Sequence, residues 1–258
     1  AQLDKTHRGQ FAPLQILKCI EAAVNSSSFD DGLAVEAKLF AECLSDPQRE
    51  ALIHIFFAER AANKIPGLSR DIPLIEINKG SVIGSGTMGG GIAMCFANAG
   101  IPVRLHDNDA ENLKKGLKVI EGNYARTVSR GRLSQDEMDN RMALIIPTEN
   151  FDDLGDADVV IEAVYENLDL KKEIFTKLDK VMKEGAILAT NTSALDVDAI
   201  AAATSRPEFV CGMHFFSPAN VMRLLEVVRG DRSSPVTLGT AMALGKRLGK
   251  VSVMAGNC

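Results

Sequence analysis

Three polar residues in the second half of the chain have the types and positions needed for proton transfer. Glu226 lies among four apolar residues in the run Leu-Leu-Glu-Val-Val, so we expect its carboxylate to be partly desolvated and to need a partner. His214 follows a predicted strand and can be that partner, while Ser193 follows another strand. A carboxylate fixes the tautomer of a histidine and stabilises its imidazolium, so the ring can take a proton from an alcohol that Ser193 hydrogen-bonds. The spacing alone also permits a satisfied buried histidine and an outward-facing glutamate.

A glycine-rich turn earlier in the chain has the spacing of a dinucleotide site. Gly84, Gly86 and Gly89 form the pattern G-x-G-x-x-G between an apolar run and an alanine-rich helix that opens near Thr87. The first glycine makes the tight turn, the second lets the backbone approach a pyrophosphate, and the third lets the helix pack close to the sheet. The first amides of the helix lack intrahelical partners and can bind an anion.

Asp107 stands at the end of the next predicted strand, where a carboxylate about 20 residues after the glycine turn can accept hydrogen bonds from the adenosine ribose. A carboxylate there repels the extra phosphate of NADP, so the pattern favours NAD. Arg104 and His106 lie nearby and weaken that preference. The alternative is a glycine turn that serves packing alone, followed by a solvated aspartate.

These residues must be positioned by the strands and helices that alternate from residue 79 onward. Predicted strands are 82–83, 103–105, 144–146, 158–164, 186–190, 209–213, 224–228 and 251–254, and further predicted helices are 111–128, 134–142, 168–182, 197–203 and 235–248. The near-continuous apolar run 158–164 is typical of a buried parallel strand. The alternation predicts an α/β fold with a doubly wound, mostly parallel sheet, in which ligands bind outside the carboxyl ends of the strands.

Residues 1–68 differ in character and predict a helical arm that ends in a linker. Apolar residues recur at helical spacing over 14–24 and 33–44, and a third helix begins with Pro47 behind Asp46 as its cap and ends before Pro66. Residues 69–78 are predicted to be a linker, and 79–258 the main domain. The arm either packs on that domain or is the remnant of a neighbouring one.

Composition and charge exclude several functions. With 29 basic and 34 acidic residues the net charge is −5, which disfavours nucleic acid and anionic membranes as partners. Five widely spaced cysteines predict reduced, buried thiols, and no His or Cys pair has metal-ligand spacing, so we expect no metal. No apolar run reaches the ~18 residues of a membrane span. We interpret His7, His54 and His106 as surface or packing residues.

From Lys79 to Cys258 the sequence resembles the NAD-binding domain of (3S)-3-hydroxyacyl-CoA dehydrogenases of fatty-acid β-oxidation. The resemblance rests on four motifs, VIGSGTMGGGIA at 82–93, VIEAVYENL at 160–168, NTSAL at 191–195 and MHFFSPANVMRLLEVV at 213–228. It implies a Rossmann-type sheet, NAD as cofactor and hydride transfer from the 3-hydroxyl carbon of a 3-hydroxyacyl-CoA, giving the 3-ketoacyl-CoA.

By position, the resemblance assigns the family's functional residues. The catalytic histidine and glutamate fall on His214 and Glu226, and the substrate-hydroxyl serine on Ser193. The cofactor contacts fall on Gly84, Gly86, Thr87, Met88, Gly89, Asp107, Glu166 and Lys171. An asparagine that follows the catalytic histidine in some members is Ser217 here, which puts that cofactor contact in doubt, and the family's CoA-binding serine and lysine have no match in the helix 111–128.

The helical arm, from Pro13 to Asn63, resembles the C-terminal helices of an enoyl-CoA hydratase domain in multifunctional β-oxidation proteins. The resemblance implies acyl-CoA as substrate and packing against hydratase and C-terminal dehydrogenase domains. The hydratase core has no match, so we expect a fragment without hydratase activity and with low dehydrogenase activity alone.

Two other functions remain open at this point. One is a stand-alone short-chain 3-hydroxybutyryl-CoA dehydrogenase, against which the helical arm argues, and the other is a non-catalytic NAD-binding or scaffold module. The compartment is expected to be the bacterial cytoplasm or, in a eukaryote, the peroxisome or mitochondrion.

Overall fold

The computed structural model describes residues 7–62, 65, 67, 69 and 71–257. Contacts divide the chain into two units, residues 1–61 and 62–258, and each is described by itself. Pro66, which bounds the predicted third helix, and Cys258, one of the cysteines predicted to be reduced, lie outside the described residues.

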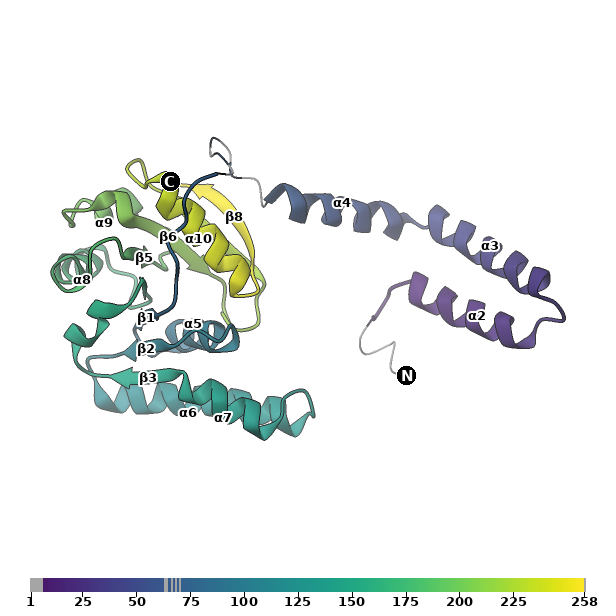
Figure 1. The fold of residues 1–258 in the computed structure, drawn as a ribbon, viewed down its shortest axis with the longest axis horizontal. Helices are drawn as coiled ribbons and strands as arrows, with labels where there is room; N and C mark the ends of the chain where they lie inside the picture. Colours follow the sequence, from purple (N-terminus) through teal and green to yellow (C-terminus); the bar gives the residue numbers. More distant parts are fainter. Residues whose placement is uncertain (1–6, 63–64, 66, 68, 70, 258) are drawn as a thin grey trace. The chain divides into compact units, whose positions relative to one another are not determined.

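The first unit is helical because clear start signals precede each run of helically spaced apolar residues. Its helices are α2 (Ala12–Asn25), α3 (Phe29–Ser45) and α4 (Pro47–Ala62). Pro13 lies in the first turn of α2, the Ser28 side chain caps α3, and the Asp46 carboxylate accepts a hydrogen bond from the amide of Gln48 at the start of α4. Helices α2 and α3 pack side by side (Figure 1).

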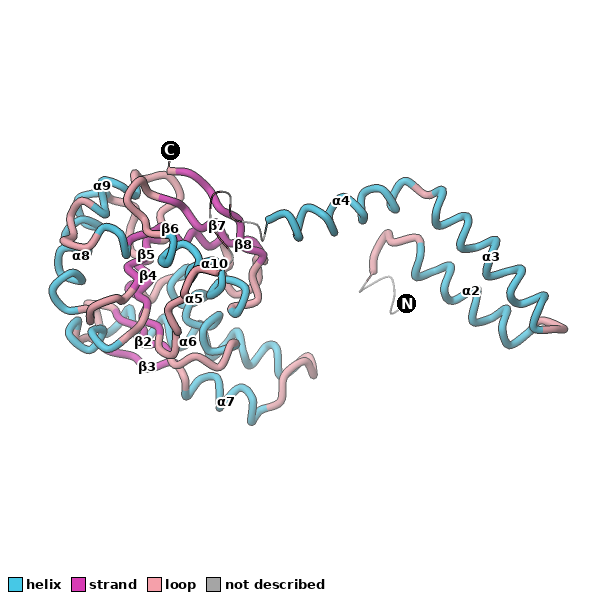
Figure 2. Tube along the Cα trace, turned by 45° about the horizontal axis from the view of Figure 1, so that its top comes forward, coloured by secondary structure: helices cyan, strands magenta, loops and turns pink. Residues whose placement is uncertain are grey.

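Within the described residues, the second unit holds an eight-stranded sheet in the order β3-β2-β1-β4-β5-β6-β7-β8. The strands are β1 (Gly80–Ile83), β2 (Val103–His106), β3 (Ile145–Thr148), β4 (Val159–Glu162), β5 (Ile187–Thr190), β6 (Val210–Phe215), β7 (Leu224–Arg229) and β8 (Val251–Gly256). All neighbouring pairs are parallel except β6 and β7, which are antiparallel. The strands run through the middle of this unit (Figure 2). The predicted doubly wound, mostly parallel sheet is confirmed.

Helices cover both faces of the sheet. They are α5 (Thr87–Asn98), α6 (Ala110–Ser129), α7 (Gln135–Ala143), α8 (Leu168–Val181), α9 (Val197–Ala201) and α10 (Pro235–Arg247), with short 3₁₀ helices at Phe151–Asp156 and Pro207–Phe209. Successive strand residues face opposite sides. Val82 therefore joins the core under α5, α6 and α10, whereas Ile83 joins the core under α8 and α9.

The segment 69–78, predicted to be a linker, forms neither helix nor strand where it is described, yet it is bound to the second unit. The amide of Ile75 donates to the Thr240 hydroxyl at 3.0 Å, and Arg247 donates to the carbonyl of Ile77 at 2.6 Å. The Asn78 amide donates to Asp158 at 2.7 Å. These bonds fix the chain where it enters β1.

One predicted strand end is wrong in a way that bears on the site. The apolar run predicts a strand that ends at Met213, with His214 following it, but β6 continues through Phe215. The reason is that β7 pairs with β6 in the antiparallel direction, and this pairing continues as far as Phe215 opposite Leu225. His214 is therefore held inside the sheet.

Cys95 and Cys211 are buried free thiols, and burial raises the pKa of Cys211 to about 12. Cys19 and Cys43 are free but only half-buried. None of the described helices is both long and apolar enough to cross a bilayer.

Candidate active site

The glycine turn between β1 and α5 is shaped by steric limits at two of its glycines. Gly84 has a φ of +97°, and a Cβ there would lie 2.8 Å from the carbonyl oxygen of Ala163. A Cβ on Gly89 would lie 1.7 Å from the carbonyl oxygen of Gly84, so only glycine allows α5 to approach the turn this closely. At Gly86 no atom lies within 4 Å of the corresponding position, which leaves that stretch of backbone open.

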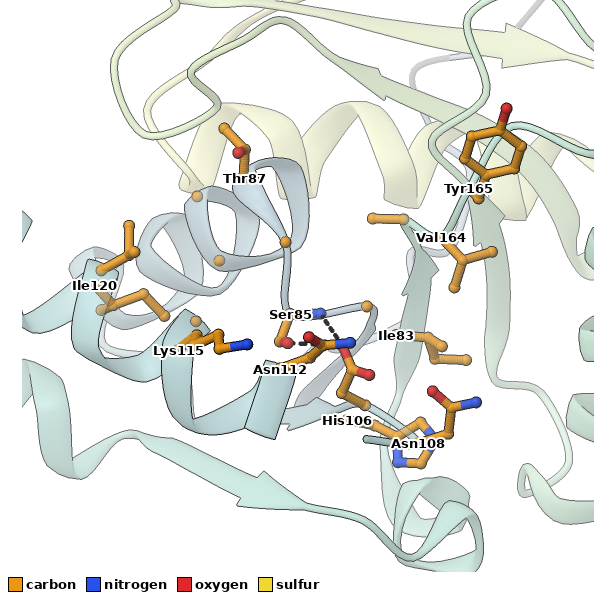
Figure 3. Close-up of a pocket in the computed structure, with 18 of the residues that line it drawn as sticks. Ile83, Ser85, Thr87, His106, Asn108, Asn112, Lys115, Ile120, Val164 and Tyr165 are labelled. Atoms are coloured by element: carbon orange, nitrogen blue, oxygen red, sulfur yellow. Dashed lines mark hydrogen bonds between the residues drawn. The ribbon is translucent and has the colours of Figure 1, made fainter. Parts of the chain in front are cut away.

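A pocket of about 750 Å³ opens over this turn (Figure 3). Gly84, Gly86 and Thr87 line it on one side. Its other lining residues include Ile83, His106, Asn112, Lys115, Ile120, Phe151, Val164, Tyr165, Ile174 and Lys177. Helix α5 begins at Thr87 without a side-chain cap, so its first amides are available to an anion. The turn thus has the open backbone and the helix dipole that a pyrophosphate needs.

Asp107 lines the same pocket and is oriented by the glycine turn itself. Its Oδ2 accepts hydrogen bonds from the amide of Ser85 at 2.9 Å and the hydroxyl of Ser85 at 2.6 Å, while Oδ1 accepts one from the Asp109 amide at 3.2 Å. Burial raises the pKa of Asp107, but the hydrogen bonds outweigh it and leave the pKa below its ordinary value. An ionised carboxylate only accepts hydrogen bonds, so Asp107 suits ribose hydroxyls and repels a phosphate.

His106, predicted to be a surface or packing residue, is buried at the edge of the pocket. Its Nδ1 lies 3.1 Å from the Thr148 carbonyl oxygen, and its ring meets that of Phe151 edge-on at 5.4 Å. Burial is the main cause that lowers the pKa of His106, so the ring is neutral at pH 7. A neutral ring beside Asp107 adds no positive charge that would attract the extra phosphate of NADP.

His214 and Glu226 face each other across the antiparallel strands β6 and β7. The register pairs the two residues directly, and Nδ1 of His214 lies 2.9 Å from Oε2 of Glu226. The side chains are 16% and 34% exposed, so both reach the surface. Because an ionised carboxylate only accepts, Nδ1–H donates to it and the lone pair of a neutral ring is on Nε2. The pair is therefore built to receive a proton on Nε2.

Ser193 lies in the turn after β5, and Glu166 holds that turn. Oε1 of Glu166 accepts hydrogen bonds from the Thr192 hydroxyl at 2.5 Å and from the Ser193 amide at 3.1 Å. Oε2 lies 3.2 Å from Nζ of Lys171. Ser193 itself is exposed. Glu166, expected to contact the nicotinamide half of NAD, is thus in direct contact with the turn that carries the serine, and Lys171 reaches that turn only through Glu166.

The sequence analysis missed a buried polar group beneath this turn. Glu162, at the end of β4, is fully buried and accepts hydrogen bonds from Lys171 and Thr190. The signal was present, because Glu162 lies in the apolar run 158–164 as Glu226 lies in its own apolar run. Asn191 was also missed, and its side chain accepts a hydrogen bond from the Phe215 amide at 2.8 Å, which ties the turn to β6.

The structure gathers the candidate residues into two groups. Gly84, Gly86, Thr87 and Asp107 line the pocket, whereas Met88 and Gly89 lie in α5 behind it. The proton-transfer pair and the Ser193 turn do not line the pocket. Tyr165 lines it and precedes Glu166, which holds the Ser193 turn, and Pro218 lines it four positions after His214. The second group therefore adjoins the pocket through these segments.

Fold and site together define a dinucleotide-binding domain of the doubly wound class. Residues 79–258 match the family model described as "3-hydroxyacyl-CoA dehydrogenase, NAD binding domain", and the chain belongs to this family. The cofactor of the domain is NAD. The open backbone at Gly86, the uncapped helix start and the ionised Asp107 fit an adenine dinucleotide with two ribose hydroxyls.

Curated relatives are long, multi-domain proteins. The chain is 42% identical to the "Peroxisomal bifunctional enzyme" of Danio rerio, over 100% of this chain and 35% of the relative, and 40% identical to that of Homo sapiens, over 100% and 36%. The "Fatty acid oxidation complex subunit alpha" of Psychrobacter cryohalolentis is 36% identical over 96% of this chain and 34% of its own length. The chain spans about a third of the length of these relatives.

Solved structures agree with the fold. A 3-hydroxybutyryl-CoA dehydrogenase from Escherichia coli superposes with a TM-score of 0.70 at 38% identity, over 71% of this chain and 39% of the other. The dehydrogenase part of multifunctional enzyme 1 from C. elegans gives a TM-score of 0.69 at 33% identity, over 78% of this chain and 48% of the other.

Among the described residues, no cluster of His, Cys, Asp and Glu could hold a metal ion.

Proposed function

We propose that this chain is the NAD-binding part of an enzyme that oxidises the 3-hydroxyl group of a (3S)-3-hydroxyacyl-CoA to a ketone. The observation that carries the proposal is the contact of 2.9 Å between His214 Nδ1 and Glu226 Oε2 beside a dinucleotide pocket. Oxidation of an alcohol to a ketone removes a proton from oxygen and a hydride from carbon, so it needs a base and a hydride acceptor next to each other.

Residues of the pocket would hold the cofactor. The backbone at Gly84 and Gly86 and the first amides of α5 would bind the pyrophosphate, and Asp107 would accept hydrogen bonds from the adenosine ribose. Glu166 would contact the nicotinamide half, and Lys171, whose side chain is 1% exposed, would support it from behind through the ion pair with Glu166. When bound, NAD supplies the acceptor for the hydride that leaves the carbinol carbon.

His214 would remove the hydroxyl proton through Nε2, and in the reverse direction the imidazolium would return it. Glu226 would stabilise the imidazolium and keep Nδ1 protonated, because the carboxylate accepts that hydrogen bond. Ser193 would donate a hydrogen bond to the substrate oxygen from its exposed position. Positioned general bases contribute about 10²- to 10⁴-fold to such reactions.

The names of the relatives suggest the metabolic role and the compartment of the reaction. Several carry names of peroxisomal or bacterial fatty-acid oxidation proteins, so we propose a role in β-oxidation, in the peroxisome of a eukaryote or the cytoplasm of a bacterium. We also propose that the chain acts beside hydratase and C-terminal dehydrogenase domains of the kinds that the resemblance implied.

The test follows NADH consumption by the protein with acetoacetyl-CoA. His214→Gln is expected to lower kcat by about 10²-fold or more while the affinity for NADH is retained, because the base is lost and the pocket is intact. His54→Gln, in the exposed surface of α4, is the matched control and is expected to leave kcat unchanged. Because low activity is expected of this part alone, NADH binding without turnover also in a longer chain that carries the neighbouring domains would instead indicate a non-catalytic module.

A further inference from the structure

A fully buried carboxylate lies beneath the candidate site and takes no part in the chemistry described above. Glu162 is 0% exposed, at the carboxyl end of β4. Its Oε1 accepts hydrogen bonds from Lys171 Nζ at 2.6 Å and from the Val164 amide at 2.8 Å, and its Oε2 accepts one from the Thr190 hydroxyl at 2.7 Å. A buried carboxylate is costly unless it is paired and hydrogen-bonded, and here three donors satisfy it.

Lys171 connects this carboxylate to the surface. Its side chain is 1% exposed, and its ammonium group lies between Glu162 Oε1 at 2.6 Å and Glu166 Oε2 at 3.2 Å. Glu166 is 41% exposed, so a charge at the surface is linked through one buried ammonium to a charge inside the sheet. An ammonium group this deeply buried stays in place only while a counter-charge is fixed beside it.

Two routes lead from Glu162 to the turn that carries Ser193. The first passes through Lys171 to Glu166, whose Oε1 accepts hydrogen bonds from the Thr192 hydroxyl and the Ser193 amide. The second passes through Thr190, whose hydroxyl oxygen accepts a hydrogen bond from the Thr192 amide at 3.3 Å. The buried carboxylate thus restricts the position of the turn through two separate chains of hydrogen bonds.

We propose that Glu162 is a positioning residue, which holds Glu166 through Lys171 and so fixes the orientation of the Ser193 turn toward the substrate hydroxyl. The inference rests on the proposed function. Its physical basis is that a small displacement of an orienting group can cost about 10²-fold in rate. Glu162 touches neither cofactor nor substrate in this role, because it is fully buried.

The first test is a double-mutant cycle with Glu162→Gln and Glu166→Gln, read as kcat for acetoacetyl-CoA reduction. Each single variant is expected to lower kcat about tenfold. In the Glu166→Gln background, Glu162→Gln is expected to change kcat by less than about threefold, because the route through Lys171 is already broken and only the route through Thr190 remains. A tenfold effect in both backgrounds would overturn the proposal, since a general loss of structure adds to the other change.

A matched control uses the same helix at its other end. Asp179 in α8 pairs with Arg206 at 3.0 Å, far along the helix from Lys171. Asp179→Asn removes a partly buried ion pair without touching the turn, and it is expected to lower the unfolding temperature while kcat stays unchanged. Equal losses of kcat in Asp179→Asn and Glu162→Gln would contradict a positioning role.

A second measurement is independent of turnover. Amide hydrogen exchange at Ser193 is expected to speed up at least about tenfold in Glu162→Gln, because the hydrogen bond to Glu166 is loosened, and to stay unchanged in Asp179→Asn. Unchanged exchange in both variants would overturn the proposal that Glu162 positions the Ser193 turn. Absence of turnover also in a longer chain with the neighbouring domains defeats the proposed function instead, while the exchange result still decides whether Glu162 positions the Ser193 turn.

If Glu162→Gln does not fold, a double variant keeps the test open. Replacing Glu162 and Lys171 together by Met removes both buried charges, a change that proteins often tolerate. The folded double variant is expected to show the tenfold lower kcat and the faster exchange at Ser193. Unaltered kcat and exchange in this variant would show that the turn needs no buried anchor.

Discussion

The hydroxyl of Ser85 lies 2.6 Å from Oδ2 of Asp107, and the Ser85 amide lies 2.9 Å from the same oxygen. The residue between the first two glycines of the turn therefore holds the acidic residue at the end of β2. The pyrophosphate part and the ribose part of the pocket are joined by these two bonds, although the residues are 22 positions apart.

Ser85→Ala is expected to weaken NADH binding about three- to tenfold, because it removes the hydroxyl that orients Asp107. The Kd for NADH, measured by fluorescence, checks this. Ser81→Ala is the matched control, since the Ser81 hydroxyl is buried without a hydrogen-bond partner among the described residues. Equal effects of the two changes on Kd would show that the contact with Asp107 does not matter.

Alanine substitutions at two glycines of the turn are expected to affect NADH binding and stability differently. Gly86→Ala meets no atom within 4 Å, so stability is expected to change by less than about 1 kcal/mol while NADH affinity falls at least about tenfold. Gly89→Ala places a methyl group 1.7 Å from the Gly84 carbonyl oxygen and is expected to reduce both. Urea unfolding and NADH titration of each variant provide the comparison. Full NADH affinity in Gly86→Ala would refute a pyrophosphate at this point.

Glu226→Gln keeps the shape of the side chain and removes its charge. The imidazolium of His214 then loses its counter-charge, so kcat for acetoacetyl-CoA reduction is expected to fall by about 10²-fold while the Kd for NADH stays unchanged. Steady-state kinetics and NADH titration of both proteins measure this, and an unchanged kcat would show that Glu226 takes no part in the proton transfer.

Asp158 is expected to make stability depend on pH. Burial raises its pKa, but hydrogen bonds from Lys183 and the amides of Lys79 and Asn78 hold it below the ordinary 3.8. A lowered pKa in the folded state means that the stabilisation is present above 3.8 and is lost as the pH falls through the folded value. Asp158→Asn is thus expected to cost about 1–2 kcal/mol at pH 7 and less near about pH 3. Urea unfolding at both values tests this, and an equal cost at both would be inconsistent with linkage.

Local patterns predicted the parts of the site that depend on local sterics. Gly84 is recognisable because its φ of +97° favours glycine, and Gly89 because a Cβ there would meet the nearby Gly84 carbonyl oxygen, whereas Gly86 meets no atom and fits the pattern through its open backbone. The position of Asp107 follows from the length of one helix and one strand. These constraints hold without knowledge of the rest of the sheet.

Other parts depend on contacts between distant strands. The apolar runs predict β6 and β7 but not their relative direction, and the direct pairing of His214 with Glu226 exists only because β7 runs antiparallel. Glu162 was missed for a similar reason, since its partners Lys171 and Thr190 come from a helix and a strand that the fold brings together. A single sequence carries no signal for such pairings beyond a charged residue in an apolar run.

The antiparallel direction of β7 makes the connection between β6 and β7 short, residues 216–223, and Lys250 donates hydrogen bonds to the carbonyls of Ala219 and Met222 within it. Asn220 and Pro218, both in that connection, line the dinucleotide pocket, while the ladder itself keeps His214 opposite Glu226. Other side chains at residues 218 and 220 would reshape the wall of the cofactor pocket, while the strand pairing would keep the acid–base geometry intact. Evolution can therefore tune the affinity for the dinucleotide at this connection without rebuilding the chemistry.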